Sequence, residues 1–128
     1  MRLWILAVTL IALAMGACST SGSAPRTGSQ RNLLTSEELA PFPQLTVYEA
    51  LERLRPRWLQ ARRAVSARDS RPQRAQVVID GFPAGGLDRL RSIRVQEVQE
   101  VRFLSAGDAT SRYGTGYVVG AIEVRTKR

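Results

Sequence analysis

The N-terminus constrains this chain more than any other feature. Residues 3–15 form an almost continuous apolar run, preceded by Arg2 and followed by Gly16, Ala17 and Cys18. At a helical rise of about 1.5 Å per residue the run would span only about 20 Å, short of a hydrocarbon core of about 30 Å. It therefore indicates a signal peptide. Because Cys18 is the only cysteine, no internal disulfide can form, and the exported domain must depend on its core.

The residues around Cys18 suggest how the exported chain is retained. Gly16 and Ala17 before a cysteine resemble the lipobox of bacterial lipoproteins, with Met15 where Leu is more typical. The resemblance implies that Cys18 becomes the acylated N-terminus, and several acyl chains make such an anchor effectively permanent. Ordinary secretion with cleavage nearby is the alternative. Ser19 lacks the Asp associated with inner-membrane retention, so we expect the outer membrane, facing the periplasm.

Composition along the chain predicts three parts: a signal peptide at 1–17, a lipidated flexible tether at 18–31 and one folded domain at 32–128. The tether is rich in Ser, Gly, Thr and Pro and has no large apolar side chain, so it cannot bury enough surface to fold. Such a tether would hold the domain roughly 20 Å from the lipid. The rest of the mature chain is long enough for one domain.

The absence of histidine narrows the possible chemistry. The sequence has no His, which removes Ser-His and Cys-His nucleophiles and histidine metal sites. The 11 acidic residues are scattered, without the spacing of a glycosidase pair or an oxygen-rich metal loop. We therefore expect a non-enzymatic protein without a cofactor or metal. A carboxylate hydrolase would need two acids converging in a cleft with raised pKa values.

Apolar periodicity and turn residues predict a small α+β domain with about four strands and four short helices. Strands are expected at 76–79, 100–104 and 118–125, with shorter candidates at 33–34 and 58–61. Short helices are expected after Thr35, over 47–55, over 87–91 and over 106–113. Residues 62–75 and 82–86 are expected to be loops, and Tyr48, Trp58 and Phe103 to lie in the core.

Local motifs support these boundaries. Thr35 with Glu38, and Thr46 with Glu49, have the spacing of capping boxes. Ser105 is expected to cap the 106–113 helix, with Asp108 at the reciprocal position and Gly114 as a left-handed stop. In the last strand, alternation places Val119, Ala121, Glu123 and Arg125 on one face, opposite Val118, Gly120, Ile122 and Val124.

Five segments of the second half resemble, in order, the plug domain of TonB-dependent outer-membrane receptors. The family pattern is a strand ending in Asp-Gly, a segment ending in Ile-Pro, a strand opening with an Ile-Glu-like pair, a helix ending in Tyr-Gly and a Gly-Gly-X-Ile strand. The corresponding segments here are 77–81, 90–93, 98–104, 109–116 and 120–126. The helix opening at Thr46 also lies where the plug's first helix is expected, so the resemblance covers most of the mature chain.

The resemblance implies a plug-like fold and an envelope compartment, and an outer-membrane barrel protein is a candidate partner. It does not imply uptake, because Arg128 ends the sequence where a receptor would continue into its barrel, and we expect no transport pore. The tether also lacks a TonB-engaging segment, and Arg94 replaces the family's proline. The candidate partner surface consists of Asp80, Gly81, Arg112, Tyr113 and Gly114. Their alternative roles are a turn and a helix end.

Positive charge is concentrated in one segment of a chain whose net charge is +8. Between residues 53 and 74 there is one acid, Asp69, and eight arginines: Arg53, Arg55, Arg57, Arg62, Arg63, Arg68, Arg71 and Arg74. Such a segment could bind anionic lipid or lipopolysaccharide phosphates, at about 1 kcal/mol per basic residue. The alternative is a solvated loop in an arginine-biased proteome. Nucleic acid is a poor partner for an exported chain.

The leading hypothesis is a non-enzymatic, lipid-anchored periplasmic module with a plug-like fold that engages an outer-membrane protein. The alternative is a binder of anionic lipid or envelope polymer that acts through the arginine segment 53–74.

Overall fold

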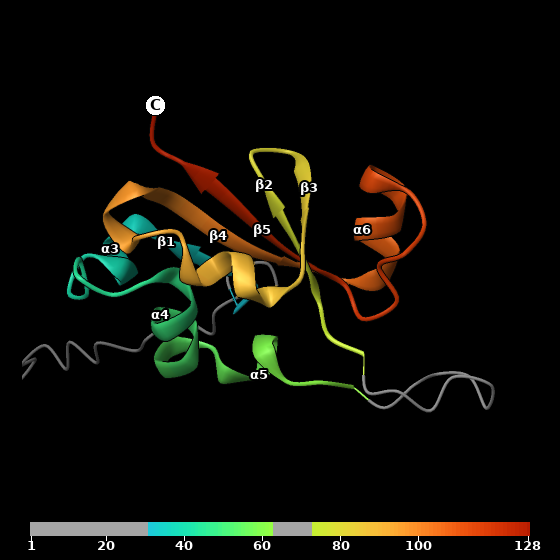
Figure 1. Cartoon of the computed structure of the whole chain (residues 1–128), viewed down its shortest axis with the longest axis horizontal. Coiled ribbons are helices and arrows are strands. Elements are labelled where there is room, and N and C mark those ends of the chain that lie inside the picture. The colour runs from blue at the N-terminus through green and yellow to red at the C-terminus, as the bar shows by residue number, and fades with distance from the viewer. Residues whose placement is uncertain (1–30, 63–72) are drawn as a thin grey trace, which may run out of the picture.

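The computed structural model describes residues 31–62 and 73–128, and these form a small mixed α+β domain, as expected (Figure 1). They contain one five-stranded sheet, four α-helices and two 3-10 helices. In chain order the elements are β1 (Leu33–Thr35), α3 (Ser36–Leu39), α4 (Val47–Leu54), α5 (Pro56–Leu59), β2 (Gln76–Ile79), β3 (Phe82–Gly85), η1 (Leu87–Arg91), η2 (Val95–Glu97), β4 (Val98–Leu104), α6 (Ala106–Tyr113) and β5 (Ala121–Thr126).

The sheet has the strand order β1-β4-β5-β2-β3, with β5 at its centre. β4 runs antiparallel to both β1 and β5, and β2 runs antiparallel to β3. β2 and β5 are parallel, so the chain between them must cross over before β5 can enter the sheet. The sheet is therefore mixed, and its central strand is the last to appear in the sequence.

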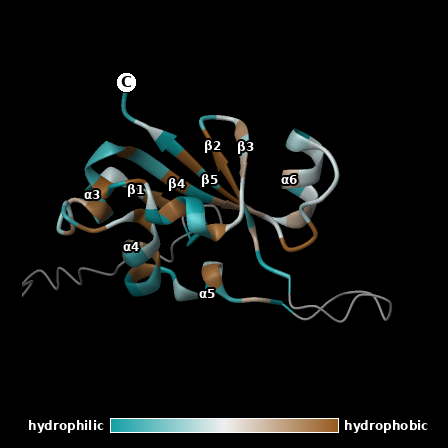
Figure 2. Ribbon diagram, in the orientation of Figure 1, coloured by the Kyte–Doolittle hydropathy of each residue, from teal (hydrophilic) through white to brown (hydrophobic). Residues whose placement is uncertain are grey.

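The main core lies on one face of the sheet, here called the first face. Ile122 and Val124 of β5 point into it, together with Val77 of β2 and Val101 of β4. Residues of α3, α4, α5, η1 and η2 cover this face. Figure 2 shows apolar, brown residues along β2 and β5 and on α5. Trp58 is buried in this core, and Tyr48 and Phe103 pack against it, so these aromatic residues lie where the sequence placed them.

Both expected capping boxes are present. The Glu38 N–H donates to Thr35 Oγ1, and the Thr35 N–H donates to Glu38 Oε2. In α4 the Thr46 N–H donates to Glu49 Oε2 at 2.8 Å, and the Thr46 hydroxyl donates to the same oxygen at 2.9 Å. These two hydrogen bonds lower the pKa of Glu49. These bonds satisfy amide groups that a helix start leaves unpaired. The caps set the direction in which α4 buries Val47 and Leu51.

Residues 58–61 do not form the expected strand. Residues 58 and 59 belong to α5, which begins at Pro56, and residues 60 and 61 follow it outside any helix or strand. Proline ends a helix that precedes it, but its fixed φ also favours the first position of a new helix. One residue therefore ends α4 and starts α5, and the helical turn buries Trp58.

Residues 82–85 form β3 rather than the expected loop. The turn that joins β3 to β2 has positive φ at both central residues, 48° at Asp80 and 88° at Gly81. Two such residues make a primed turn, whose twist matches paired strands. β3 is an irregular edge strand, because Pro83 lacks an N–H, the register shifts between Val77 and Val78, and the Ala84 carbonyl accepts a hydrogen bond from Arg89 Nε.

Three other boundaries differ in detail. Gly114 ends α6 with positive φ, but its ψ of −163° lies outside the expected left-handed helical region. The last strand begins at Ala121 rather than Val118, and β4 begins two residues before the expected Glu100. Of the expected 62–75 loop, residues 63–72 lie outside the described structure, while Arg62 and Gln73 exchange backbone hydrogen bonds.

Within residues 31–62 and 73–128, no helix is both long enough and apolar enough to cross a membrane.

Gly120 predicts a sharp stability difference between two glycine sites. Its φ is 113°, and a Cβ there would overlap the Leu104 carbonyl oxygen, whereas Gly116 has a similar φ of 111° and open space around it. We expect Gly120→Ala to lower the free energy of unfolding by at least about 3 kcal/mol, and Gly116→Ala by only about 1–2 kcal/mol of backbone strain. Chemical denaturation of both variants measures this difference, and equal losses would contradict the close packing at Gly120.

Candidate binding surface

The second face of the sheet carries charged side chains along its two central strands. Val101 and Val124 pair in register and point into the core, so alternation sends their neighbours to the other side. These neighbours are Glu100 and Arg102 on β4 and Glu123 and Arg125 on β5. Glu100 lies opposite Arg125, and Arg102 opposite Glu123, so the strands oppose unlike charges.

α6 covers only one end of the second face. A smaller cluster forms there from buried Val78, Leu104, Ala109, Tyr117 and Ala121, with Tyr113 packed against it. Ser105 caps α6 by accepting the Asp108 N–H at 3.2 Å, while its hydroxyl donates to the Asp108 carboxylate at 2.6 Å. The second face is thus apolar beneath α6 and charged beyond it.

Glu123 lies at the boundary between these two parts. It is 6% exposed, and among the residues that the structure describes it is the one charged residue that is buried. The Tyr113 hydroxyl donates to Glu123 Oε1 at 2.8 Å, and Arg112 Nη1 lies 3.9 Å from Glu123 Oε2. Burial raises the pKa of the Tyr113 hydroxyl, and the hydrogen bond to Glu123 raises it further by a smaller amount. Burying a carboxylate is costly without such partners, so the C-terminal end of α6 holds this charge in place.

Glu100 connects the remaining charges of the second face. Its Oε1 lies 3.4 Å from Arg125 Nη1 and 3.6 Å from Arg102 Nη2. The arginine side chains are 56% and 38% exposed, respectively, so each pair is worth only about 0–1 kcal/mol. These arginines therefore retain hydrogen-bonding capacity towards a partner.

A hollow of about 680 Å³ opens at the edge of this face near the C-terminus. Its wall is polar and mostly charged: Asp80, Gly81, Gln99, Glu123, Arg125, Thr126, Lys127 and Arg128. The volume is within the range of ligand pockets, but those are lined mainly by apolar side chains. The lining suits hydrogen-bonding and charged groups of a partner better than an apolar small molecule.

Asp80 fixes the β2–β3 turn to the end of β5. Its Oδ1 accepts the Thr126 N–H at 2.9 Å, and its Oδ2 accepts the Thr126 hydroxyl at 2.6 Å. The hydroxyl bond and then the backbone bond lower the pKa of Asp80. A general acid needs a raised pKa, so Asp80 does not have the shift that this role requires. Among the described residues, no group of three acidic, His or Cys side chains could hold a metal ion.

The structure brings most of the expected partner surface to the second face. Asp80 and Gly81 line the hollow, while Arg112 and Tyr113 contact Glu123, which lines it too. Gly114 only ends α6. The alternative roles are present as well, because Asp80 and Gly81 form a turn and Tyr113 and Gly114 end a helix.

The arginine segment is distributed over several local environments. Arg53 lies over the Phe42 ring at 5.8 Å, and Arg55 pairs with Glu38 at 3.2 Å. Arg57, Arg62 and Arg74 are exposed. Arg63, Arg68 and Arg71 lie outside the described residues, as does Cys18.

Sequence analysis did not single out Glu100, Arg102, Glu123 or Arg125 as site residues. For β5 the sequence did contain a signal for these residues, because the alternation of side chains already placed Glu123 and Arg125 on the face away from Ile122 and Val124. In β4 the same alternation places Glu100 and Arg102 on the face away from Val101, and the bulge lies before these residues. No local pattern predicts the contact between Tyr113 and Glu123.

The Tyr113–Glu123 bond predicts a measurable coupling. Tyr113→Phe leaves Glu123 Oε1 without this donor, and we expect a loss of about 1–3 kcal/mol in the free energy of unfolding. In a Glu123→Met background the same change should cost less than about 0.5 kcal/mol, because no carboxylate remains to be satisfied. Urea unfolding of the four proteins gives the coupling energy, and additive losses would show that the bond does not hold α6.

Asp80 predicts a pH-dependent contribution to stability. Because its folded-state pKa is lowered, the carboxylate stabilises the fold above its unfolded pKa, and this contribution disappears as pH falls through the lower folded pKa. We expect Asp80→Asn to unfold at lower urea than the wild type at pH 7, with the difference shrinking below about pH 4. Asn tolerates the positive φ of this turn. A difference that is equal at both pH values would contradict a role for the charge.

No protein family, curated protein or solved structure matches this chain in comparisons with known proteins.

Proposed function

We propose that this chain is a non-enzymatic, lipid-anchored binding module of the cell envelope, with a fold like the plug domain of TonB-dependent receptors. Cys18 carries the lipid, the outer membrane holds it, and the domain faces the periplasm. Its partner is an outer-membrane barrel protein, engaged through the charged part of the second face. The observation that carries the proposal is this half-covered face, on which a buried carboxylate and exposed arginines lie beside a polar hollow.

The positions of the family-like segments support the plug-like fold. The segment ending in Asp80-Gly81 is β2 with its turn, and the segment ending in Tyr113-Gly114 is α6 with its stop. The Gly120 segment leads into β5, which pairs with both β2 and β4. Three of the five segments thus supply β2, β4 and β5, which are neighbours in the sheet, and a fourth supplies α6.

Energetics support a binding role for the second face. Partly exposed ion pairs such as Glu100–Arg125 add little to stability, and a buried carboxylate costs more than an apolar side chain of similar size. Folding alone therefore does not require this arrangement. Arginine is enriched at protein interfaces, and its planar guanidinium recognises carboxylates with two parallel hydrogen bonds.

A lipid anchor favours a binding partner that lies in the same membrane. A tether of about thirteen residues confines the domain to within roughly 20 Å of the lipid surface, which raises its effective concentration towards neighbouring membrane proteins. The lack of histidine removes the side chain best suited to proton transfer near neutral pH, which supports binding rather than catalysis.

Capture of the partner tests this proposal. We expect the lipidated full-length protein, purified from its native envelope in mild detergent, to recover a specific outer-membrane barrel protein. Arg125→Glu should reduce that recovery at least tenfold, because it places a like charge beside Glu100 on the binding face. Quantitative mass spectrometry of the eluates measures the recovery.

Arg94→Glu is the matched control, because Arg94 is exposed and lies outside the second face. It changes the net charge equally and should leave recovery within about twofold of the wild type. Equal losses in both variants, or a barrel protein recovered equally by Arg125→Glu, would contradict binding through the second face. A Cys18→Ser variant separately tests whether the anchor is needed.

A further inference from the structure

A second hollow, of about 480 Å³, lies at the corner between α4 and α5, beside the first described residue. We call it the corner groove. It is lined by Arg31, Asn32, Leu54, Arg55, Pro56, Arg57 and Trp58. Two distant parts of the chain therefore meet here: the residues that follow the tether, and the turn between two helices.

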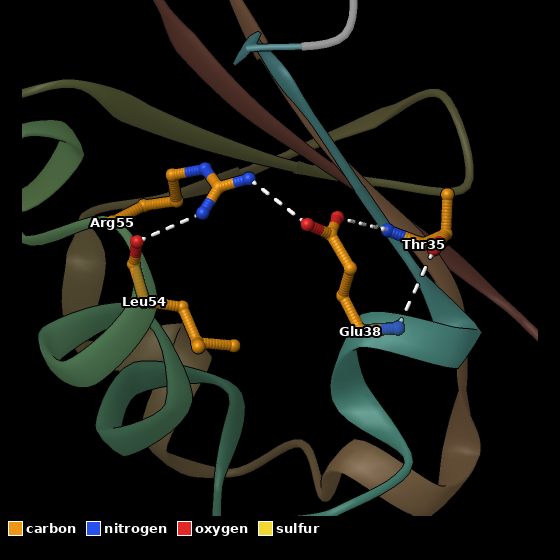
Figure 3. A network of polar contacts seen from close by, with 4 residues as sticks. All are labelled: Thr35, Glu38, Leu54 and Arg55. Carbon is orange, nitrogen blue, oxygen red and sulfur yellow. Dashed lines mark hydrogen bonds and ion pairs between the residues drawn. The ribbon is translucent and has the colours of Figure 1, made fainter. Parts of the chain in front are cut away.

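The walls of the corner groove are held by defined contacts. Arg55 Nη1 donates to the Leu54 carbonyl at 2.9 Å, and Arg55 Nη2 donates to Glu38 Oε1 at 3.2 Å (Figure 3). Glu38 in turn belongs to the capping box of α3. Trp58 is 7% exposed, and its ring lies 5.8 Å from that of Phe103. The groove thus combines a fixed guanidinium with an apolar floor.

Two further arginines at the corner groove have charges that the described structure leaves unpaired. Arg31 and Arg57 are both exposed, and neither forms an ion pair with another described residue. At this corner Arg55 forms an ion pair with Glu38. The rim is therefore a site of uncompensated positive charge beside an apolar floor, a combination that suits the boundary between lipid head groups and acyl chains.

We propose that the corner groove docks on the phosphates of anionic lipids in the membrane that holds the Cys18 anchor. This inference rests on the proposed anchor, because the expected tether ends at Arg31 and so joins the domain at this corner. Each arginine near a negative surface contributes enough attraction to change occupancy several-fold. Arg31 and Arg57 are the cations that bind phosphate, and Arg55 shapes the groove.

Docking through the corner groove would orient the whole domain. α4 and α5 cover the first face of the sheet, so the second face turns away from the lipid. Figure 1 shows α4 and α5 at one side of the domain and the β2–β3 turn and the C-terminus at the opposite side. The polar hollow at Asp80 and Arg125 is then left uncovered by the lipid.

Trp58 provides an internal probe for the test. The sequence has two tryptophans, Trp4 in the expected signal peptide and Trp58 in the groove. The full-length gene product, purified as the lipidated protein, is reconstituted into phosphatidylcholine vesicles that carry a spin label on some head groups, with and without phosphatidylglycerol. We expect stronger quenching of Trp58 fluorescence when phosphatidylglycerol is present. Raising salt from about 0.1 M to about 1 M should reverse it, because the Debye length falls from about 10 Å to about 3 Å.

The variants separate the corner groove from general charge. Arg31→Gln with Arg57→Gln should remove at least half of the phosphatidylglycerol-dependent quenching, and replacing both residues by Lys should largely restore it. Arg89→Gln with Arg94→Gln removes the same charge from exposed sites outside the groove and should leave quenching unchanged. Equal quenching in neutral vesicles, or an equal loss in the control pair, would overturn the proposal.

The proposed anchor and the proposed lipid binding by the corner groove can be refuted independently. The intact mass of the purified protein reports the acyl chains on Cys18, so a protein without them refutes the anchor. An acylated protein that shows no phosphatidylglycerol-dependent quenching refutes the groove and leaves the anchor standing.

Discussion

The register of β5 is the constraint on which the rest of the structure depends. It is the central strand, paired with β4 on one side and β2 on the other, and its alternation sends Ile122 and Val124 into the core and Glu123 to the second face. A slip of one residue would bury charge and expose the core. Hydrogen bonds hold both ends of the strand: the Gln76 N–H donates to the Gly120 carbonyl, and the Thr126 N–H donates to the Asp80 carboxylate. The same register therefore builds the core and the candidate binding surface.

Much of the fold could be predicted because its elements have local causes. Capping boxes start α3 and α4, and Asp80-Gly81 forms the expected turn. Prediction failed where one residue has two opposed roles. Pro56 ends one helix and begins another, and Pro83 lies in a segment with loop composition that nevertheless pairs with β2. For the site, sequence could place Asp80 and Tyr113, but the contact of Tyr113 with Glu123 depends on how α6 packs on the sheet.

The domain separates its two proposed surfaces on opposite sides of one sheet. The first face is covered by short helices, and the corner between α4 and α5 carries Arg31 and Arg57, for which the described residues supply no ion-pair partner. The second face carries paired charges and the polar hollow. A polar network there is rigid because the hydroxyl of Tyr113 and the backbone at Thr126 hold its carboxylates. In this proposal, attachment to lipid and recognition of a partner do not compete for the same residues.

The edges of the sheet have a consequence for the protein at high density. β1 has only three residues, and β3 is interrupted by Pro83, a register shift and the bond from Arg89 to the Ala84 carbonyl. Neither edge offers a long row of free backbone groups for another strand. If many copies are anchored side by side, their sheets meet at edge strands that are too short or too irregular to pair. Crowding in the plane of a membrane would then leave the copies as separate molecules, instead of joining their sheets into a continuous fibre.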